Sequence, residues 1–173
     1  MRREVWNLRA RRAMARLLPA LAAVIEKNGM RIVHYSVQHD HIHLVVESGD
    51  KATLSRGMRG LCTSIAKRLN ALMGRKGRVL ADRYHERVLT TPRQVRSALR
   101  YVLCNARKHG VAPRDPRWLD SCSSAAVFDG WSVAVIPLGA ACPTSAPMTW
   151  LLRTGWRRAG PSIDPAEVPG ALA

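Results

Sequence analysis

Three histidines lie within five residues of the segment QHDHIHLVVES, residues 38–48, which continues into an apolar, β-branched stretch. Side chains alternate along a β-strand, so His41 and His43 should point to one side of a strand. Two adjacent imidazoles can bind one divalent metal ion if one or two further ligands come from elsewhere. The pair by itself also fits exposed or hydrogen-bonded histidines. His39 precedes the strand and is interpreted as a turn residue.

Tyr101 and Asn105 form a second pair with possible chemistry. They lie four residues apart in a segment of helical periodicity, and therefore on one face of a helix. A tyrosine hydroxyl, with a reference pKa of about 10, can attack phosphorus when a metal ion withdraws charge from the phosphate and cations favour the phenolate. Asn105 could supply an oxygen as a third metal ligand. Taken alone, Tyr101 also fits an ordinary amphipathic helix, and Asn105 a polar surface position.

A helix and a hairpin should position the histidine pair. Residues 5–28 carry apolar side chains three or four positions apart with arginines between them, which predicts a helix that ends at Gly29. Residues 30–37 and 41–48 are short β-rich segments joined by a polar link, which predicts a hairpin. The core-facing side chains of the second strand should be Ile42, Leu44 and Val46.

Two more helices follow in the prediction. Asp50 can cap a helix that runs to residue 72, and residues 79–89 should be extended or form a further hairpin. Thr91 as N-cap and Pro92 as first residue mark the start of the helix that carries Tyr101, and Gly110 marks its end. The core face of the first of these helices should comprise Leu54, Met58, Leu61, Ile65, Leu69 and Leu72, and that of the second Val95, Leu99, Val102 and Ala106.

The positive charge is confined to the first part of the chain. The 28 Lys and Arg residues outnumber the 12 Asp and Glu residues, for a formal net charge of +16. Residues 1–110 hold 23 of the basic and 7 of the acidic side chains, whereas residues 111–173 hold 5 of each. Such an excess favours a polyanionic partner, most commonly nucleic acid. A ribosomal or nucleoid-type basic protein, or charge that serves solubility alone, fits the same numbers.

Residues 1–110 are therefore predicted to form one domain, and residues 111–173 a mostly irregular C-terminal tail rich in proline and serine. The four cysteines show no metal-finger spacing, which indicates reduced thiols. No apolar run approaches the roughly 20 residues of a membrane span. The arginines inside the N-terminal apolar segment favour an amphipathic helix over a signal peptide, so we expect a cytoplasmic, nucleoid-associated protein.

HDHIHLVVE followed by RYVLCNARKHG resembles the single-tyrosine HUH transposases, and in particular the REP-associated tyrosine transposases. That family carries a His-hydrophobe-His motif before aliphatic residues, then a helix with Tyr, three residues, and Asn. DRYHERVL and the helix that starts at residues 91–92 also match the pattern between the two motifs. The resemblance covers residues 5–110 and short parts of the tail. It implies an α+β, ferredoxin-like domain with an antiparallel sheet and helices on one face.

The resemblance also implies roles for individual residues. His41, His43 and Asn105 would bind Mg²⁺ or Mn²⁺, and Tyr101 would be the nucleophile. The reaction would cleave single-stranded DNA, often folded as a hairpin or palindromic repeat, leave a 5′-phosphotyrosine and a free 3′-OH, and rejoin strands by reversal. The protein would act as a monomer or homodimer. The candidate DNA contacts are Arg56, Arg59, Lys67, Arg68, Arg75, Lys76, Arg78, Arg83 and Lys108.

Two departures from the family pattern stand out. Family members begin with a β-strand before the first helix, whereas this chain starts almost directly on that helix, so we expect a missed upstream start or a truncated copy. Asp40 stands where the family usually has Asn before the histidine pair, and it could either add a charge near the metal or turn the hairpin. Tyr35 and Tyr84 are weaker nucleophile candidates, because neither has Asn four residues later.

Three functions remain open from the sequence. A metal-dependent transposase with a tyrosine nucleophile uses all four site residues. A catalytically decayed relative would bind DNA through the basic surface alone. A metal-dependent phosphodiesterase would use water in place of Tyr101.

Overall fold

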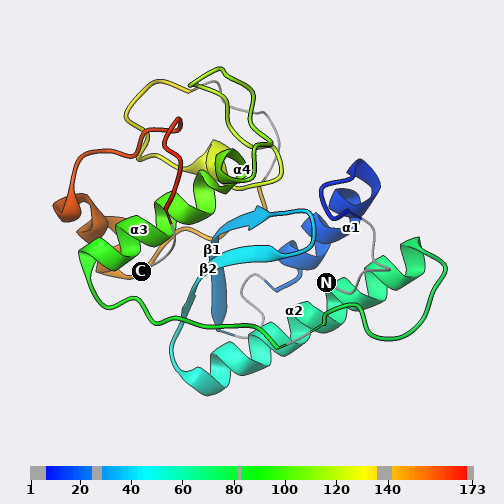
Figure 1. Cartoon of the computed structure of the whole chain (residues 1–173). Helices are drawn as coiled ribbons and strands as arrows, with labels where there is room; N and C mark the ends of the chain where they lie inside the picture. Colours follow the sequence, from blue (N-terminus) through cyan, green and yellow to red (C-terminus); the bar gives the residue numbers. More distant parts are fainter. Residues whose placement is uncertain (1–6, 25–28, 82, 136–141, 171–173) are drawn as a thin grey trace.

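The computed structural model describes residues 7–24, 29–81, 83–135 and 142–170 (Figure 1). Residues 1–6, which precede the first helix, lie outside this description, so the expectation of a missing first strand is not tested here. The elements up to residue 110 are α1 (Arg11–Ala22), β1 (Met30–Val37), β2 (Ile42–Ser48), α2 (Lys51–Leu72), α3 (Pro92–Leu103) and α4 (Asn105–Lys108). In the described part of the tail, the elements are η1 (Ala125–Val127), α5 (Trp150–Arg153) and η2 (Gly155–Ala159). The chain is thus a mixed α+β protein, as predicted.

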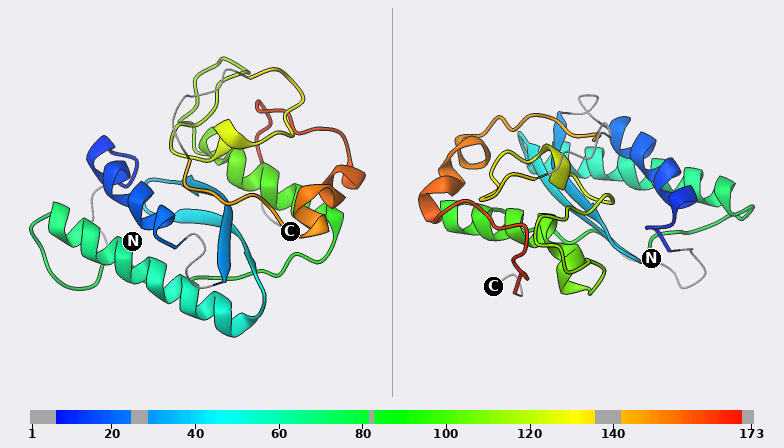
Figure 2. Two further views of the ribbon diagram at one scale, coloured as in Figure 1. Left: turned by 180° about the vertical axis from the view of Figure 1, so that it is seen from behind. Right: turned by 90° about the horizontal axis from the view of Figure 1, so that it is seen from above.

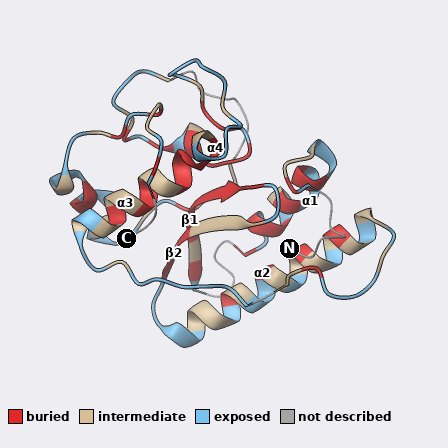
Figure 3. Cartoon of the chain, in the orientation of Figure 1, coloured by how far each residue is buried: buried red, intermediate tan, exposed pale blue. Residues whose placement is uncertain are grey.

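The predicted hairpin is present as an antiparallel two-stranded sheet of β1 and β2. A register shift between Ile32 and His34 leaves Val33 as one extra residue in β1, which is a β-bulge. The bulge exchanges the faces of β1, so Ile32 before it and Tyr35 after it pack into the same core, although their parity differs. Along its length β1 is buried, whereas much of β2 is only partly covered (Figure 3).

Helices cover both faces of this sheet, so the expectation of helices on one face is wrong. Ile42, Leu44 and Val46 of β2 pack into a core formed with α1 and α2, as the alternation predicts. Val33 and Val45 point to the other face and pack with α3 and the tail in a second core. Figure 2 shows the sheet between the two layers. The prediction of helices on one face failed because alternation in a strand identifies its apolar face but does not show whether the polar face is also covered.

The helix boundaries follow local signals. The Asp50 side chain accepts a hydrogen bond from the Thr53 amide at the start of α2, and Thr91 and Gln94 form a reciprocal capping box at the start of α3. All residues predicted for the two core faces are buried or packed against a core. The predicted helix over residues 5–28 is shorter in the described part. The described residues of the segment 79–89 form neither a helix nor a paired strand. Cys104 interrupts the last helix between α3 and α4.

The tail pairs with the edge of β1 that faces away from β2. The Val37 amide donates to the Cys122 carbonyl, and the Ser124 amide donates to the Tyr35 carbonyl at 3.0 Å. Further along, the Ser145 amide donates to the Ile32 carbonyl at 2.7 Å. These bonds occupy backbone groups that a sheet edge would otherwise leave exposed. The irregular tail therefore protects one edge of the small sheet.

A buried ion pair fixes the tail to the start of the chain. The Arg9 guanidinium donates two hydrogen bonds to the Asp120 carboxylate, at 2.7 and 2.8 Å, and one to the Val37 carbonyl. The side chains are only 13% and 1% exposed, respectively. The hydrogen bond to Asp120 raises the pKa of Arg9. Tail residues also complete the second core, with Phe128, Trp156 and Ile163 nearly inaccessible. Within the described residues, no helix is both long and apolar enough to cross a membrane.

Replacing Asp120 should destabilise the fold strongly. Asp120→Ala leaves the Arg9 guanidinium buried without its carboxylate, which typically costs about 3 kcal/mol or more. We expect a matching fall in the free energy of unfolding in urea and faster proteolysis of the tail. Glu86→Ala is the control, because the Lys51–Glu86 pair is exposed at the lysine and such pairs contribute less than about 1 kcal/mol. Equal stability of the two variants would contradict this role of the ion pair.

Candidate active site

The histidine pair lies where β2 begins, on the face covered by α3. The Nε2 atoms of His41 and His43 are 3.0 Å apart, and the rings meet edge to face. The two side chains share a side of the strand because of the two-residue alternation, as predicted. Both histidines are only partly exposed. Their imidazole nitrogens thus converge on one point beside the sheet.

Asp40 holds His41 in one orientation. The distance between Asp40 Oδ1 and His41 Nδ1 is 2.7 Å. A carboxylate can only accept, so Nδ1–H of His41 donates and neutral His41 presents the lone pair of Nε2 toward His43. This hydrogen bond lowers the pKa of the Asp40 carboxyl. The sequence left the role of Asp40 open, and the geometry places it directly behind His41.

His43 stays uncharged at neutral pH. Burial, and then the positive charges that His41, His109 and Lys108 can carry, lower its pKa to about 4. Burial dominates because a charged imidazole loses solvation beneath α3. A neutral imidazole keeps a lone pair that can bind a metal ion.

Tyr101 of α3 lies against the histidine pair. Its ring meets that of His43 edge to face, with centroids 5.0 Å apart. The Nζ atom of Lys108 lies 4.9 Å from the Tyr101 ring centroid. Tyr101 is partly exposed and packs at the margin of the second core. A nucleophile candidate, an uncharged histidine and a cation therefore share one site.

Asn105 is fully buried, which corrects its interpretation as a polar surface residue. The side chain has no exposed area, and within the described residues neither Oδ1 nor Nδ2 has a hydrogen-bond partner. Buried amides are almost always hydrogen-bonded, because an unpaired one costs about 1–3 kcal/mol. An amide left without partners next to a site is a candidate ligand-binding group.

His109 belongs to the same cluster, although the sequence interpretation did not include it. Its ring centroid lies 5.9 Å from that of His41. The His109 amide still donates to the Asn105 carbonyl across one helical turn. Tyr101, Asn105 and His109 are spaced by four residues, and the first and last contact His43 and His41, respectively. That i, i+4, i+8 spacing was the available signal for His109.

The predicted DNA-contacting residues are spread over the molecule. Lys108 contacts the site through Tyr101. Arg56, Arg59, Lys67 and Arg68 lie on α2, in the layer on the opposite face of the sheet. The remaining candidates, Arg75, Lys76, Arg78 and Arg83, lie in the connection between α2 and α3. All nine side chains are at least partly exposed.

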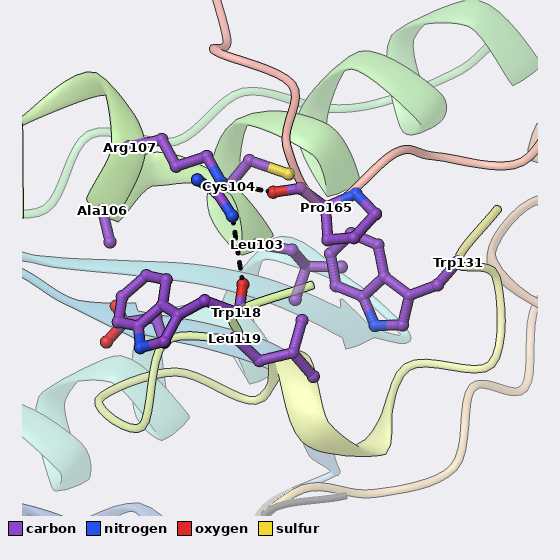
Figure 4. Close-up of a pocket in the computed structure, with 9 residues that line it drawn as sticks. Leu103, Cys104, Ala106, Arg107, Trp118, Leu119, Trp131 and Pro165 are labelled. Atoms are coloured by element: carbon purple, nitrogen blue, oxygen red, sulfur yellow. Dashed lines mark hydrogen bonds between the residues drawn. The ribbon is translucent and has the colours of Figure 1, made fainter. Parts of the chain in front are cut away.

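A small pocket opens on the other side of α4, between that helix and the tail (Figure 4). Cys104, Ala106 and Arg107 line it, but Asn105 does not. The Arg107 guanidinium donates to the carbonyls of Pro165 and Trp118, among others, so its donors are already used in holding the tail. The pocket is therefore part of the tail's packing and not of the histidine site.

Two histidines and one asparagine are the groups that could hold a metal ion here. Within the described part of the chain, no group of three or more His, Cys, Asp or Glu residues has a suitable arrangement. Among the described residues, a third ligand could be an amide such as Asn105, and a solvent molecule or a substrate oxygen could also serve. The arrangement can bind a phosphate-coordinating cation with Tyr101 close by.

Comparison with known proteins identifies a family for this chain. The family model described as "Transposase IS200 like" matches residues 1–103, which include both histidines and Tyr101. No curated protein and no solved structure matches the chain. The match spans more than half of the chain, and membership implies a DNA transposase or endonuclease activity. The chain belongs to the IS200-like transposase family.

Proposed function

We propose that this protein is a metal-dependent transposase with an HUH domain of ferredoxin-like organisation, which cleaves and rejoins single-stranded DNA through Tyr101. The observation that carries the proposal is the contact of Tyr101 with His43 in a cluster where His41 and His43 nitrogens converge. A tyrosine with only a structural role on a helix does not require a histidine pair beside it. The DNA substrate would be a hairpin or palindromic repeat.

The residues present fit a divalent cation. Two ligands at right angles, each about 2.1 Å from an octahedral ion, lie about 3 Å apart. The Nε2 atoms of His41 and His43 are separated by 3.0 Å. The unpaired Oδ1 of buried Asn105 would be the third protein ligand. Mg²⁺ or Mn²⁺ bound there would withdraw charge from a scissile phosphate and so favour attack at phosphorus.

Tyr101 performs the covalent step in this proposal. Its Oη forms a bond to phosphorus while the bond from phosphorus to the 3′ oxygen breaks, which yields a 5′-phosphotyrosine and a 3′-OH. The phenolic proton leaves, and the departing 3′ oxygen takes up a proton. The phosphotyrosine is itself a phosphodiester, so the energy of the broken bond is kept for rejoining. Attack by a 3′-OH on the phosphotyrosine reverses the step. Lys108, beside the Tyr101 ring, would neutralise charge on the phosphate.

Hydrogen bonding between Asp40 and His41 supports a positioning role in the same site. Metal-binding histidines commonly donate their second ring N–H to a carboxylate or carbonyl, which fixes the ring and makes the ligand nitrogen more basic. Asp40 does this with a full carboxylate at 2.7 Å. In this proposal, Asp40 thus acts through His41 rather than on the DNA.

Tyr101→Phe should abolish a covalent protein–DNA adduct. The test uses a labelled pool of hairpin oligonucleotides with randomised single-stranded flanks, Mg²⁺ or Mn²⁺, and a denaturing gel. Wild-type protein and the Tyr84→Phe control should form the adduct, because Tyr84 lies in the exposed connection before α3. Cleavage without an adduct would instead indicate hydrolysis by water. Binding without cleavage would indicate a non-catalytic DNA-binding protein.

Asp40→Ala should weaken binding of Mn²⁺ by about 10- to 100-fold, the usual effect of removing such a hydrogen-bond partner. Asp40→Asn should retain part of the affinity, since its amide oxygen still accepts from His41. Titration calorimetry of the free protein measures both. Asp129→Ala serves as the control, because the Asp129 side chain is 85% exposed and pairs with Arg157 in the tail. Unchanged affinity in Asp40→Ala would refute the positioning role.

Asn105→Leu should keep or raise stability while it removes adduct formation. Leucine fills a similar volume without burying unpaired polar atoms, so the free energy of unfolding should stay within about 1 kcal/mol of wild type or increase. Ser124→Ala is the contrasting variant, since its hydroxyl bonds His34 and the Tyr35 amide. Urea unfolding should show a loss for Ser124→Ala only. An equal loss in Asn105→Leu would indicate that Asn105 is structural.

A further inference from the structure

The short helix α5 carries an exposed tryptophan, Trp150, whose position is fixed by its neighbours. Trp150 is 51% exposed and is the most exposed aromatic residue of the described part of the chain. Its ring lies on Gly155, where a Cβ would sit only 2.7 Å from a ring carbon. Exposing a large apolar ring costs free energy, and a rigid exposed indole is a common contact group for ligands.

α5 is fixed from both sides. The Glu47 carboxylate of β2 accepts from the amides of Met148 and Thr149 at 2.8 Å, and from the Thr149 hydroxyl at 2.6 Å. Leu152 and Trp156 pack into the second core together with α3. Neither set of contacts uses the exposed part of Trp150. The indole is therefore held in place by its neighbours without being covered.

Two arginines without acidic partners accompany the indole. The Arg158 guanidinium lies 5.2 Å from the Trp150 ring centroid, and Arg153 is exposed one turn along α5. Arg157 differs, because it pairs with Asp129 at 3.2 Å. Within the described residues, no ion pair is formed by Arg153 or Arg158. The tail is neutral in total, yet this surface is locally cationic.

This surface and the histidine site share one face of the sheet. Glu47, which anchors α5, follows His43 by four residues on β2 and points to the same side, about 13 Å along the strand. Tyr101 lies in the last turn of α3, and α5 packs near the other end of that helix (Figure 1). The histidine site and α5 thus lie toward opposite ends of α3.

We propose that Trp150, Arg153 and Arg158, here termed the α5 surface, form a second contact site for single-stranded DNA. One base stacks on the Trp150 indole, while Arg153 and Arg158 contact the adjacent phosphates. Aromatic stacking with cationic neighbours is the chemistry by which proteins bind single strands with little sequence preference. The inference rests on the proposed function for its substrate, and it assigns a binding role to the tail.

Equilibrium binding tests the α5 surface without any cleavage. Fluorescence anisotropy with a labelled hairpin carrying a single-stranded extension is measured in EDTA for the full-length protein. Trp150→Ala should weaken binding about 10-fold, a typical loss for one stacked base. Trp150→Phe should retain most of the affinity, and a blunt hairpin should bind equally to all variants. Arg153→Ala with Arg158→Ala should lower the salt dependence of binding by about two ions.

The controls separate this proposal from the proposed function. Val168→Ala changes another exposed apolar side chain of the tail and should leave binding unchanged. If Trp150→Ala is misfolded by circular dichroism, the exposed arginine variants decide the question. If wild type, Trp150→Ala and the double arginine variant bind the hairpin with its single-stranded extension equally well, the α5 surface is refuted, even if Tyr101 forms an adduct. Trp150-dependent binding in a protein that forms no adduct would support the surface while refuting the catalytic proposal.

Discussion

The two-residue alternation of β2 is the constraint on which the rest of the structure depends. Even-numbered residues from Ile42 to Val46 pack with α1 and α2, which leaves the odd-numbered side chains for the opposite face. That face carries His41 and His43 at one end of β2 and Glu47 at the other. A shift of one residue in register would exchange these sets, burying histidines in the apolar core and exposing the core residues. The register of β2 against β1 therefore keeps the apolar side chains in the core and the histidines at the candidate site.

Packing of α3 on this second face brings the two halves of the site together. Val95, Leu99 and Val102 bury one stripe of α3, and the adjacent stripe then directs Tyr101 toward His43. The same packing buries the Asn105 side-chain amide without a hydrogen-bond partner among the described residues, at a cost that packing alone does not explain. Natural proteins retain such costs mainly at functional sites. Under the proposed function, stability and metal binding would oppose each other at Asn105, next to the break at Cys104.

Much of the fold could be predicted because its signals are local. Caps at Asp50 and Thr91, the helical spacing of α2 and α3, and the alternation in β2 each depend on a few neighbouring residues. The candidate site residues were predicted from spacing and from the family resemblance, and their roles stay predictions. The presence of helices on both faces of the sheet was not predicted, because the position of α3 depends on contacts between segments far apart in sequence. His109 and the burial of Asn105 were missed for the same reason.

The tail shows most clearly where such prediction ends. It has no period, and its average charge is zero, so composition describes it as an irregular appendage. Its order comes from pairing with groups that the domain leaves unpaired: backbone atoms at the edge of β1, the guanidinium of Arg9, and the Glu47 carboxylate. Each of these partners is polar and lies more than 80 residues away along the chain. Averaging over the tail also hides that three of its five arginines, Arg153, Arg157 and Arg158, lie in or directly after α5, where among the described residues only Arg157 pairs with an acid. A neutral segment can therefore still extend a cationic, nucleic acid-binding face, because a strand of DNA responds to local charge and exposed rings rather than to the sum over a segment.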